Sequence, residues 1–206
     1  MSELRVALTF DAEHPSRRGA DPAAATGILD ALAAAHARAT FFVQGRWASA
    51  YPDLARRIAE EGHVVGNHSN YHAPMTLLTD QGIRTDVQEA EQRIGDATGA
   101  DPHPWFRCPF GDGEDSPAVQ EALARLGYRI VPWEVDGGDW QDDASPGDVE
   151  EAVADRVLHR AGNGSSTVVL LHTWPSATAR TLPGLLGRLA GEGAVFVSVE
   201  EVGRGA

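Results

Sequence analysis

Residues 4–11 of the chain, LRVALTFD, form an apolar run that closes on an aspartate. A short continuous apolar run of this kind predicts a buried β-strand, with Asp11 standing where the strand leaves the core. Glu13 follows two residues later. Because successive side chains of an extended chain alternate, we expect Asp11 and Glu13 on the same side of it.

Apolar runs alternate with helical patterns along the rest of the chain. Such regular alternation favours an α/β fold with a parallel sheet. About seven strand–helix units leave two architectures open, a small barrel and an open doubly wound sheet, which periodicity alone does not separate. The expected strands are 4–11, 39–44, 63–66, 105–107, 129–135, 167–172 and 194–199, and the expected helices are 22–36, 52–61, 80–98, 116–126, 146–160 and 182–190.

The composition is that of a soluble globular protein, because 42% of the 206 residues are hydrophobic and 23% are charged. There is no internal repeat, and Gly and Pro are spread between the elements instead of forming a linker. One domain, residues 1–206, is therefore the economical interpretation. Cys108 is the only cysteine, which excludes an intramolecular disulfide and fits a reducing compartment.

The formal net charge is −13, and the chain contains no lysine. Such a surface repels nucleic acids and anionic membranes, so neither is an expected partner. The first residues lack the features of a secretory signal, and no run approaches the roughly 18 apolar residues of a membrane span. We therefore expect a cytoplasmic protein.

Side chains capable of chemistry follow five of the expected strands. In a parallel α/β fold the carboxyl ends of the strands lie on one face, and active sites form there. We therefore expect these side chains to converge on one site. They are Asp11 and Glu13, His68 and His72, Arg107, Asp136 and Asp139, and His172.

His68 and His72 are the candidate metal ligands. A spacing of four residues would put the two imidazoles on one side of a helical turn, which suits a divalent cation. The glutamate of the HExxH motif is missing between them, which disfavours a zincin-type protease. The alternative is two ordinary loop histidines.

Three further side chains have possible roles beside such a cation. Asp11 could ligate it or take a proton from water, and an arginine such as Arg107 beside Asp11 would keep that carboxylate ionised. His172 could donate a proton to a leaving group, and an aspartate bonded to it would fix its tautomer. Each residue also has an ordinary structural interpretation. Cys108 is disfavoured as a nucleophile, because nothing in the sequence argues for a lowered thiol pKa.

With this set of residues, the chain resembles the polysaccharide deacetylases, carbohydrate esterase family 4, over most of its length. Five segments are similar to the family's motifs and occur in the family's order. Each is weak alone, but the ordered set is specific. They are TFD at 9–11 (family TFDD), HSNYH at 68–72 (H-S/T-x-x-H), RCPFG at 107–111 (R-x-P-x-G), DGGDW at 136–140 (D-x-x-D-W) and LLH at 170–172 (L-x-H).

The resemblance implies a distorted (β/α) barrel of seven or eight parallel strands. It also implies a divalent metal held by one aspartate and two histidines, here His68 and His72. The metal in the family is usually zinc, although a site with two histidines and one carboxylate also accepts cobalt, nickel, manganese or iron.

By the same resemblance, Asp11 would be the general base and His172 the general acid. Arg107 would orient Asp11, and Asp139 would tune His172. The candidate substrate-binding residues are Tyr71, Pro109, Phe110, Trp140 and Leu170, of which Trp140 and Leu170 would line an acyl pocket.

One position departs from the family's pattern. The second aspartate of TFDD, normally the third metal ligand, is Ala12 here. We expect Glu13 to reach in and replace it. Two alternatives stay open: Asp11 itself moves to the metal and another group serves as the base, or the metal is weak or absent.

The expected activity is metal-dependent hydrolysis of an N- or O-acetyl group on a carbohydrate or amino-sugar-like substrate. The enzymatic alternative is a cyclic amide or ureide hydrolase, resembling allantoinase- or imidase-like relatives on the same fold. The non-enzymatic alternative is a pseudoenzyme or binding module that lost full metal ligation through Ala12.

Overall fold

The computed structural model describes residues 3–16, 20–161 and 166–202, and the chain divides into two compact units. The first unit comprises Met1–Phe10, Ser16–Thr40 and Trp133–Ala206, and the second comprises Asp11–Pro15 and Phe41–Pro132. The interpretation of residues 1–206 as one domain stays a prediction.

The described residues of the first unit form four strands. They are β1 (Leu4–Ala12, whose last two residues belong to the second unit), β6 (Val135–Asp136), β7 (Thr167–His172) and β8 (Ala194–Phe196). The β1–β8 and β6–β7 pairs are parallel, and β1 neighbours β7. Every residue of β7 is buried, as is typical of a parallel strand covered on both faces.

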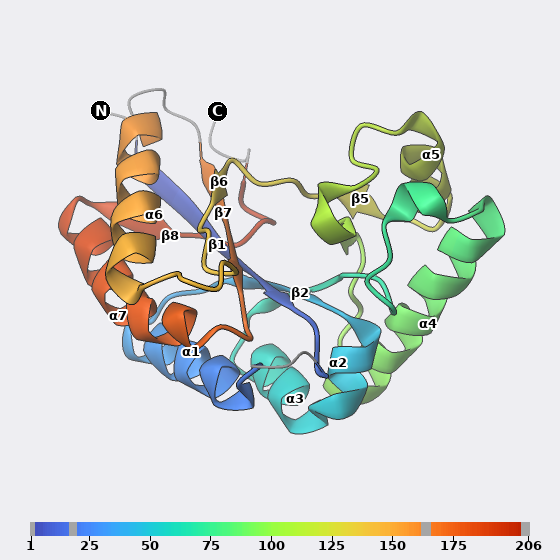
Figure 1. Ribbon diagram of the computed structural model, residues 1–206, viewed down its shortest axis with the longest axis horizontal. Helices are drawn as coiled ribbons and strands as arrows, with labels where there is room; N and C mark the ends of the chain where they lie inside the picture. The colour runs from blue at the N-terminus through green and yellow to red at the C-terminus, as the bar shows by residue number, and fades with distance from the viewer. Residues whose placement is uncertain (1–2, 17–19, 162–165, 203–206) are drawn as a thin grey trace. The chain divides into compact units, whose positions relative to one another are not determined.

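Three helices accompany these strands: α1 (Pro22–Ala34), α6 (Pro146–Ala161) and α7 (Ser176–Gly191). α7 packs against both α1 and α6 (Figure 1). Asp21 caps α1, because its side chain accepts a hydrogen bond from the Ala23 N–H and Pro22 occupies the first helical position. This is the helix start that the sequence predicts.

The second unit repeats the alternation of strand and helix. Its strands are β2 (Thr40–Val43, whose first residue belongs to the first unit), β3 (Val64–Asn67), β4 (Trp105–Phe106) and β5 (Arg129–Ile130). They neighbour one another in that order, and the β3–β4 and β4–β5 pairs are parallel. Its α-helices are α2 (Gly45–Ala50), α3 (Pro52–Glu60), α4 (Asp80–Thr98) and α5 (Pro117–Arg125), with short 3₁₀ turns at η1 (Met75–Leu77) and η2 (Pro109–Gly111).

The long helix α4 organises this unit, because it packs against α2, α3 and α5 (Figure 1). Thr79 caps its start, and Gly99 ends it in the left-handed conformation, with φ of 69°. The expected helix at 80–98 is therefore confirmed. Its apolar face contributes to a core cluster that contains Met75, Ile83, Val87, Phe106, Cys108, Val119, Ala122, Leu123 and Tyr128.

The expected strand at 129–135 is wrong. The segment forms two short strands instead: β5 at Arg129–Ile130 pairs with β4 in the second unit, and β6 at Val135–Asp136 pairs with β7 in the first. Pro132 lies between them. Proline has no N–H to donate to a strand ladder, so it breaks the apolar run that suggested one strand.

Two helices also differ from expectation. The sequence did not predict α2, and α7 begins at Ser176, six residues before its expected start. Threonines and Pro183 dilute the apolar pattern of α7, yet Thr178 and Thr181 are buried on it. The ends of the remaining expected elements lie within three residues of those observed.

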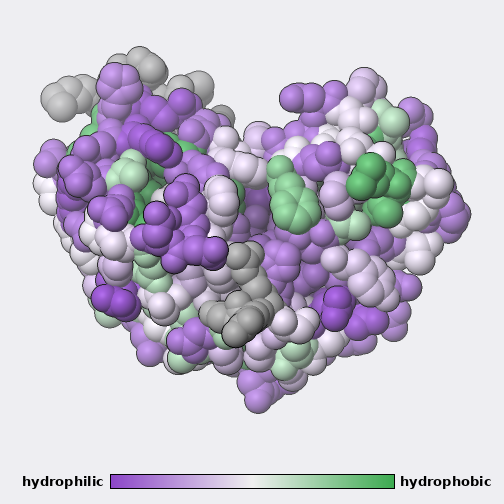
Figure 2. Space-filling view, in the orientation of Figure 1, coloured by the Kyte–Doolittle hydropathy of each residue, from purple (hydrophilic) through white to green (hydrophobic). Residues whose placement is uncertain are grey.

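The surface is mostly hydrophilic on the face drawn in Figure 2. Within the described residues, the large hydrophobic side chains that stand exposed are Tyr71, Leu77, Phe110, Trp140 and Val195. No helix in this part of the chain combines the length and the apolar character needed to cross a membrane.

Candidate active site

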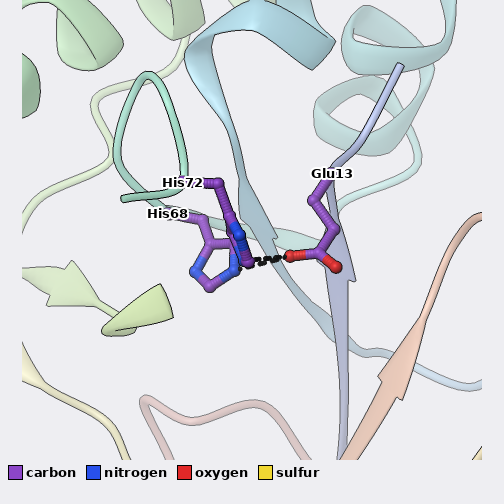
Figure 3. Close-up of side chains that lie close together, drawn as sticks. All are labelled: Glu13, His68 and His72. Carbon is purple, nitrogen blue, oxygen red and sulfur yellow. Dashed lines mark hydrogen bonds and ion pairs between the residues drawn. The ribbon is translucent and has the colours of Figure 1, made fainter. Parts of the chain in front are cut away.

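Glu13, His68 and His72 form a buried cluster in the second unit. Figure 3 shows the Glu13 carboxylate pointing at both imidazoles. Glu13 Oε2 lies 2.5 Å from His72 Nε2 and 3.0 Å from His68 Nε2. Each residue offers one ligand atom, and these atoms lie within 4.8 Å of one another. The three are the only His, Cys, Asp or Glu group of this kind within the described residues.

The alternation at the end of β1 places the carboxylates. Asp11 and Glu13, on either side of Ala12, are both buried and both approach His68. Asp11 Oδ2 lies 3.4 Å from His68 Nε2, compared with 3.0 Å for Glu13 Oε2. Glu13 is therefore the carboxylate that the structure places between the two histidines.

The loop that carries His68 and His72 is not the helical turn that their spacing suggested. Ser69 and His72 adopt left-handed backbone conformations, with φ of 61° and 58°. Such residues interrupt a right-handed helix. The two imidazoles converge because of this irregular loop, with ring centroids 4.9 Å apart.

Buried polar side chains hold the loop in this shape. Asp86 on α4 accepts the backbone N–H groups of Asn70 and Tyr71 at 2.9 and 3.1 Å. Asn67 Oδ1 accepts the Ser69 N–H, and Ser69 Oγ accepts the His72 N–H. Burial raises the pKa of Asp86 despite its backbone hydrogen bonds. The loop's conformation therefore depends on specific acceptors instead of a helical ladder.

The donor set of the cluster suits a divalent cation. His68 Nδ1 bonds the Arg107 carbonyl at 2.9 Å, so its Nε2 is the ring atom directed at Glu13. One carboxylate oxygen thus faces two imidazole nitrogens, an arrangement that a shared cation satisfies well. Two imidazoles and one carboxylate are typical of metal sites that keep a position open for water or substrate.

The electrostatics of the cluster favour an ionised carboxylate. Burial raises the pKa of Glu13, but hydrogen bonds with His14, His68 and His72 outweigh it and hold the pKa well below its usual value. Burial lowers the pKa of His68, whereas Asp11 and Glu13 raise it, and the net change is upward. Burial dominates at His72 and lowers its pKa.

Asp11 is held by Arg107 in the same unit. Arg107 Nη1 donates to Asp11 Oδ1 at 3.0 Å, and Arg107 Nε donates to the Val131 carbonyl at 3.2 Å. The guanidinium is fully buried and lies 4.1 Å from the centre of the Phe42 ring. The contact implied by the resemblance is therefore present, whereas the catalytic role of Asp11 stays a prediction.

His172 and Asp139 form a pair in the first unit. His172 Nδ1 bonds Asp139 Oδ1 at 2.8 Å, and the His172 backbone N–H donates to Asp139 Oδ2 at 2.7 Å. Thr178 on α7 also donates to Asp139 Oδ2 at 2.5 Å, the third hydrogen bond to this carboxylate. The convergence of His172 with the cluster of Glu13, His68 and His72 stays a prediction.

The candidate substrate-binding residues divide between the two units. In the second unit, Tyr71 and Phe110 are exposed, Pro109 is buried, and the Phe110 ring lies 4.4 Å from that of His72. In the first unit, Leu170 is buried and the half-exposed Trp140 donates to Asp136 Oδ1 at 3.2 Å. Their part in substrate binding stays a prediction.

Sequence reasoning missed several residues that shape the site. Asp86 carried a usable signal, because it is a carboxylate on the apolar stripe of Ile83, Val87 and Ala90. Thr178 carried none, since its helix was predicted to begin later. His14 lies beside the expected ligand, but only the structure shows its contact with Glu13.

Cys108 is a buried free thiol. Burial, together with Glu114 and Asp112, raises its pKa to about 12. Nucleophilic cysteines need a lowered pKa, so the environment of Cys108 disfavours this role, as the sequence did.

Comparison with known proteins places this geometry in a family. The sequence model of the polysaccharide deacetylase family matches residues 1–131. The chain is 33% identical over 199 residues to the peptidoglycan-N-acetylglucosamine deacetylase PgdA of Listeria monocytogenes, which covers 96% of this chain and 38% of that protein. The chain thus spans less than half the length of this relative.

Solved structures agree. A T48 deacetylase with substrate has a TM-score of 0.81 and 30% identity, covering 97% of this chain and 90% of that one. A CE4 family pseudoenzyme from Bacillus anthracis has a TM-score of 0.77 and 26% identity, covering 97% of this chain and 65% of that one. The expected α/β fold of the deacetylase type is confirmed, and the chain belongs to the polysaccharide deacetylase family.

Proposed function

We propose that this protein is a metal-dependent deacetylase that hydrolyses an acetyl group on a carbohydrate or amino-sugar-like substrate. The observation that carries the proposal is the position of Glu13. The family's second aspartate is missing at Ala12, and Glu13 Oε2 faces both His68 and His72 instead. The substitution therefore leaves two imidazoles and a carboxylate on one site.

Glu13, His68 and His72 would hold the cation, with zinc as our first candidate and cobalt, nickel, manganese or iron as the others. A divalent cation held there would polarise the acetyl carbonyl and lower the pKa of a water molecule.

Asp11 is the proposed general base. Arg107 Nη1 donates to its Oδ1 at 3.0 Å and its Oδ2 lies 3.4 Å from His68 Nε2, so the carboxylate borders the cluster where it would accept a proton from attacking water. In the reaction the carbonyl carbon gains an oxygen, the bond to the leaving nitrogen or oxygen breaks, and acetate is released.

His172 is the proposed general acid. Its Nδ1 bonds Asp139 Oδ1, and Nε2 would carry the proton given to the departing amine or alcohol. Asp139, bonded also by Thr178 and by the His172 backbone, would fix the tautomer of the ring.

For the substrate we propose an N-acetylated amino sugar, as the name of the Listeria relative suggests. This chain covers 38% of that relative, so the relative's substrate is the first one to test on this chain. A cytoplasmic location likewise stays a prediction, which fractionation of cells producing the protein would check.

Acetate release by the purified full chain tests the proposal. The chain is stripped with a chelator, reloaded with zinc or cobalt, and assayed on N-acetylglucosamine oligomers, acetylated xylan, allantoin and a cyclic imide. We expect metal-restored acetate release from an acetylated sugar, and its loss in Glu13→Ala. Turnover of the ring substrates alone would instead indicate the cyclic amide hydrolase. A metal-replete chain inert on every substrate would support the pseudoenzyme, as the Bacillus anthracis neighbour is described.

A further inference from the structure

We propose that His14 is a positioning residue for Glu13. It binds one carboxylate oxygen so that the other is presented to His68 and His72. This inference rests on the proposed function, because it concerns how the replacement ligand is held. Nothing in the sequence pattern of the site requires a histidine at this position.

The two oxygens of Glu13 are divided between different partners. Oε1 lies 3.0 Å from His14 Nε2, whereas Oε2 lies 2.5 Å from His72 Nε2 and 3.0 Å from His68 Nε2. A carboxylate only accepts hydrogen bonds, so His14 Nε2 is the donor in the first contact. The carboxylate is thus fixed in rotation as well as in place.

His14 is itself held in an unusual conformation. Its backbone φ is 54°, in the left-handed region that side-chain-bearing residues rarely adopt. Its N–H donates to Gln44 Oε1 at 3.0 Å, and the Gln44 N–H donates to the Ala12 carbonyl at 2.9 Å. These two hydrogen bonds, which we call the Gln44 clamp, hold the backbone on both sides of Glu13. The His14 ring is then directed at Glu13 Oε1.

The His14 ring also packs on a candidate ligand. It meets the His72 ring edge to face, with centroids 4.5 Å apart and an interplanar angle of 68°. This contact restricts where the His14 ring can lie, so the hydrogen bond to Glu13 is directional.

A positioning partner is useful because glutamate replaces aspartate. Glutamate has one more rotatable bond than aspartate, so ordering it as a ligand costs more side-chain entropy. Removing a side chain that orients a metal ligand typically lowers metal affinity about 10- to 100-fold. The Gln44 clamp and the His14 hydrogen bond together offset the longer side chain.

Zinc affinity of the full chain, measured by competition with a chromophoric chelator, tests the inference. We expect His14→Ala to weaken affinity about 10- to 100-fold, and His14→Gln, whose amide can donate, to stay within a few-fold of wild type. His14→Phe keeps the ring but not the donor, and should resemble His14→Ala. His36→Ala is the matched control, because His36 is an exposed histidine with φ of 51°.

Glu13→Ala separates this inference from the proposed function. If Glu13→Ala keeps full zinc affinity, the proposed metal site fails. If Glu13→Ala loses affinity while folded His14→Ala and His14→Phe keep it, the site stands and the role of His14 is overturned. If His14→Gln binds as weakly as His14→Ala and the visible spectrum of the cobalt form changes, His14 is a ligand and not a positioning residue. Circular dichroism verifies that each variant is folded.

Discussion

The backbone carbonyl of Arg107 accepts a hydrogen bond from His68 Nδ1 at 2.9 Å, while the side chain of the same arginine binds Asp11 at 3.0 Å. One residue therefore orients a candidate metal ligand through its main chain and the candidate base through its guanidinium. Because a substitution changes only the side chain, the two roles can be separated.

Arg107→Lys is expected to lower kcat/KM about 10²- to 10⁴-fold while leaving zinc affinity within a few-fold of wild type. Lysine keeps the charge but lacks the planar fork that reaches Asp11 and the Val131 carbonyl together. Steady-state kinetics and chelator competition measure the two quantities. The exposed Arg125→Lys serves as the control, and an equal loss of zinc affinity and activity in Arg107→Lys would contradict the separation.

Asp86→Asn should disturb the loop of His68 and His72. An asparagine offers one acceptor oxygen where Asp86 offers two, so the N–H of Asn70 or Tyr71 loses its partner. The expected result is a loss of about 1–3 kcal/mol in the free energy of unfolding, measured in urea. Zinc affinity should also fall about tenfold, since the loop carries both histidines.

The matched control for this prediction is Asp96→Asn, an exposed position on the same helix. It should change neither quantity. An Asp86→Asn variant that is destabilised but binds zinc as tightly as wild type would show that the loop keeps its shape without this acceptor.

Thr178→Val tests the pair of His172 and Asp139. It removes the hydroxyl that donates to Asp139 Oδ2 and leaves a methyl against a buried carboxylate. We expect deacetylase activity to fall about tenfold, with zinc affinity unchanged and with recovery in Thr178→Ser. Thr181→Val is the control, because Thr181 is also buried on α7 but donates to the Pro146 carbonyl. Equal losses of activity in the two valine variants would argue for a purely structural effect.

Cys108 should resist alkylation in the folded protein. A thiol whose pKa is raised to about 12 is almost wholly protonated at pH 8, and the protonated form is not the nucleophile. Mass spectrometry after iodoacetamide treatment is expected to show no label on the native chain and full labelling in urea. Cys108→Ala should retain activity, and rapid labelling of the native chain would contradict the burial of this thiol.

The sequence determined most of the fold. Apolar periodicity reports which residues are buried, so it located the strands of Leu4–Ala12 and Thr167–His172 and the whole of α4. It failed at 129–135, because periodicity does not show that the segment divides at Pro132 into two strands that pair with different neighbours.

The sequence also determined which residue types stand at the strand ends, and the alternation around Ala12 pointed Glu13 and Asp11 the same way. Only the tertiary structure decided how His68 and His72 meet Glu13. That meeting joins residues 55 apart in the chain through a loop with left-handed residues, whose N–H groups are satisfied by Asp86, Asn67 and Ser69. Hydrophobic periodicity indicates which side chains are buried. The shape of such a loop depends on individual hydrogen bonds between distant segments, and only the folded chain shows these bonds.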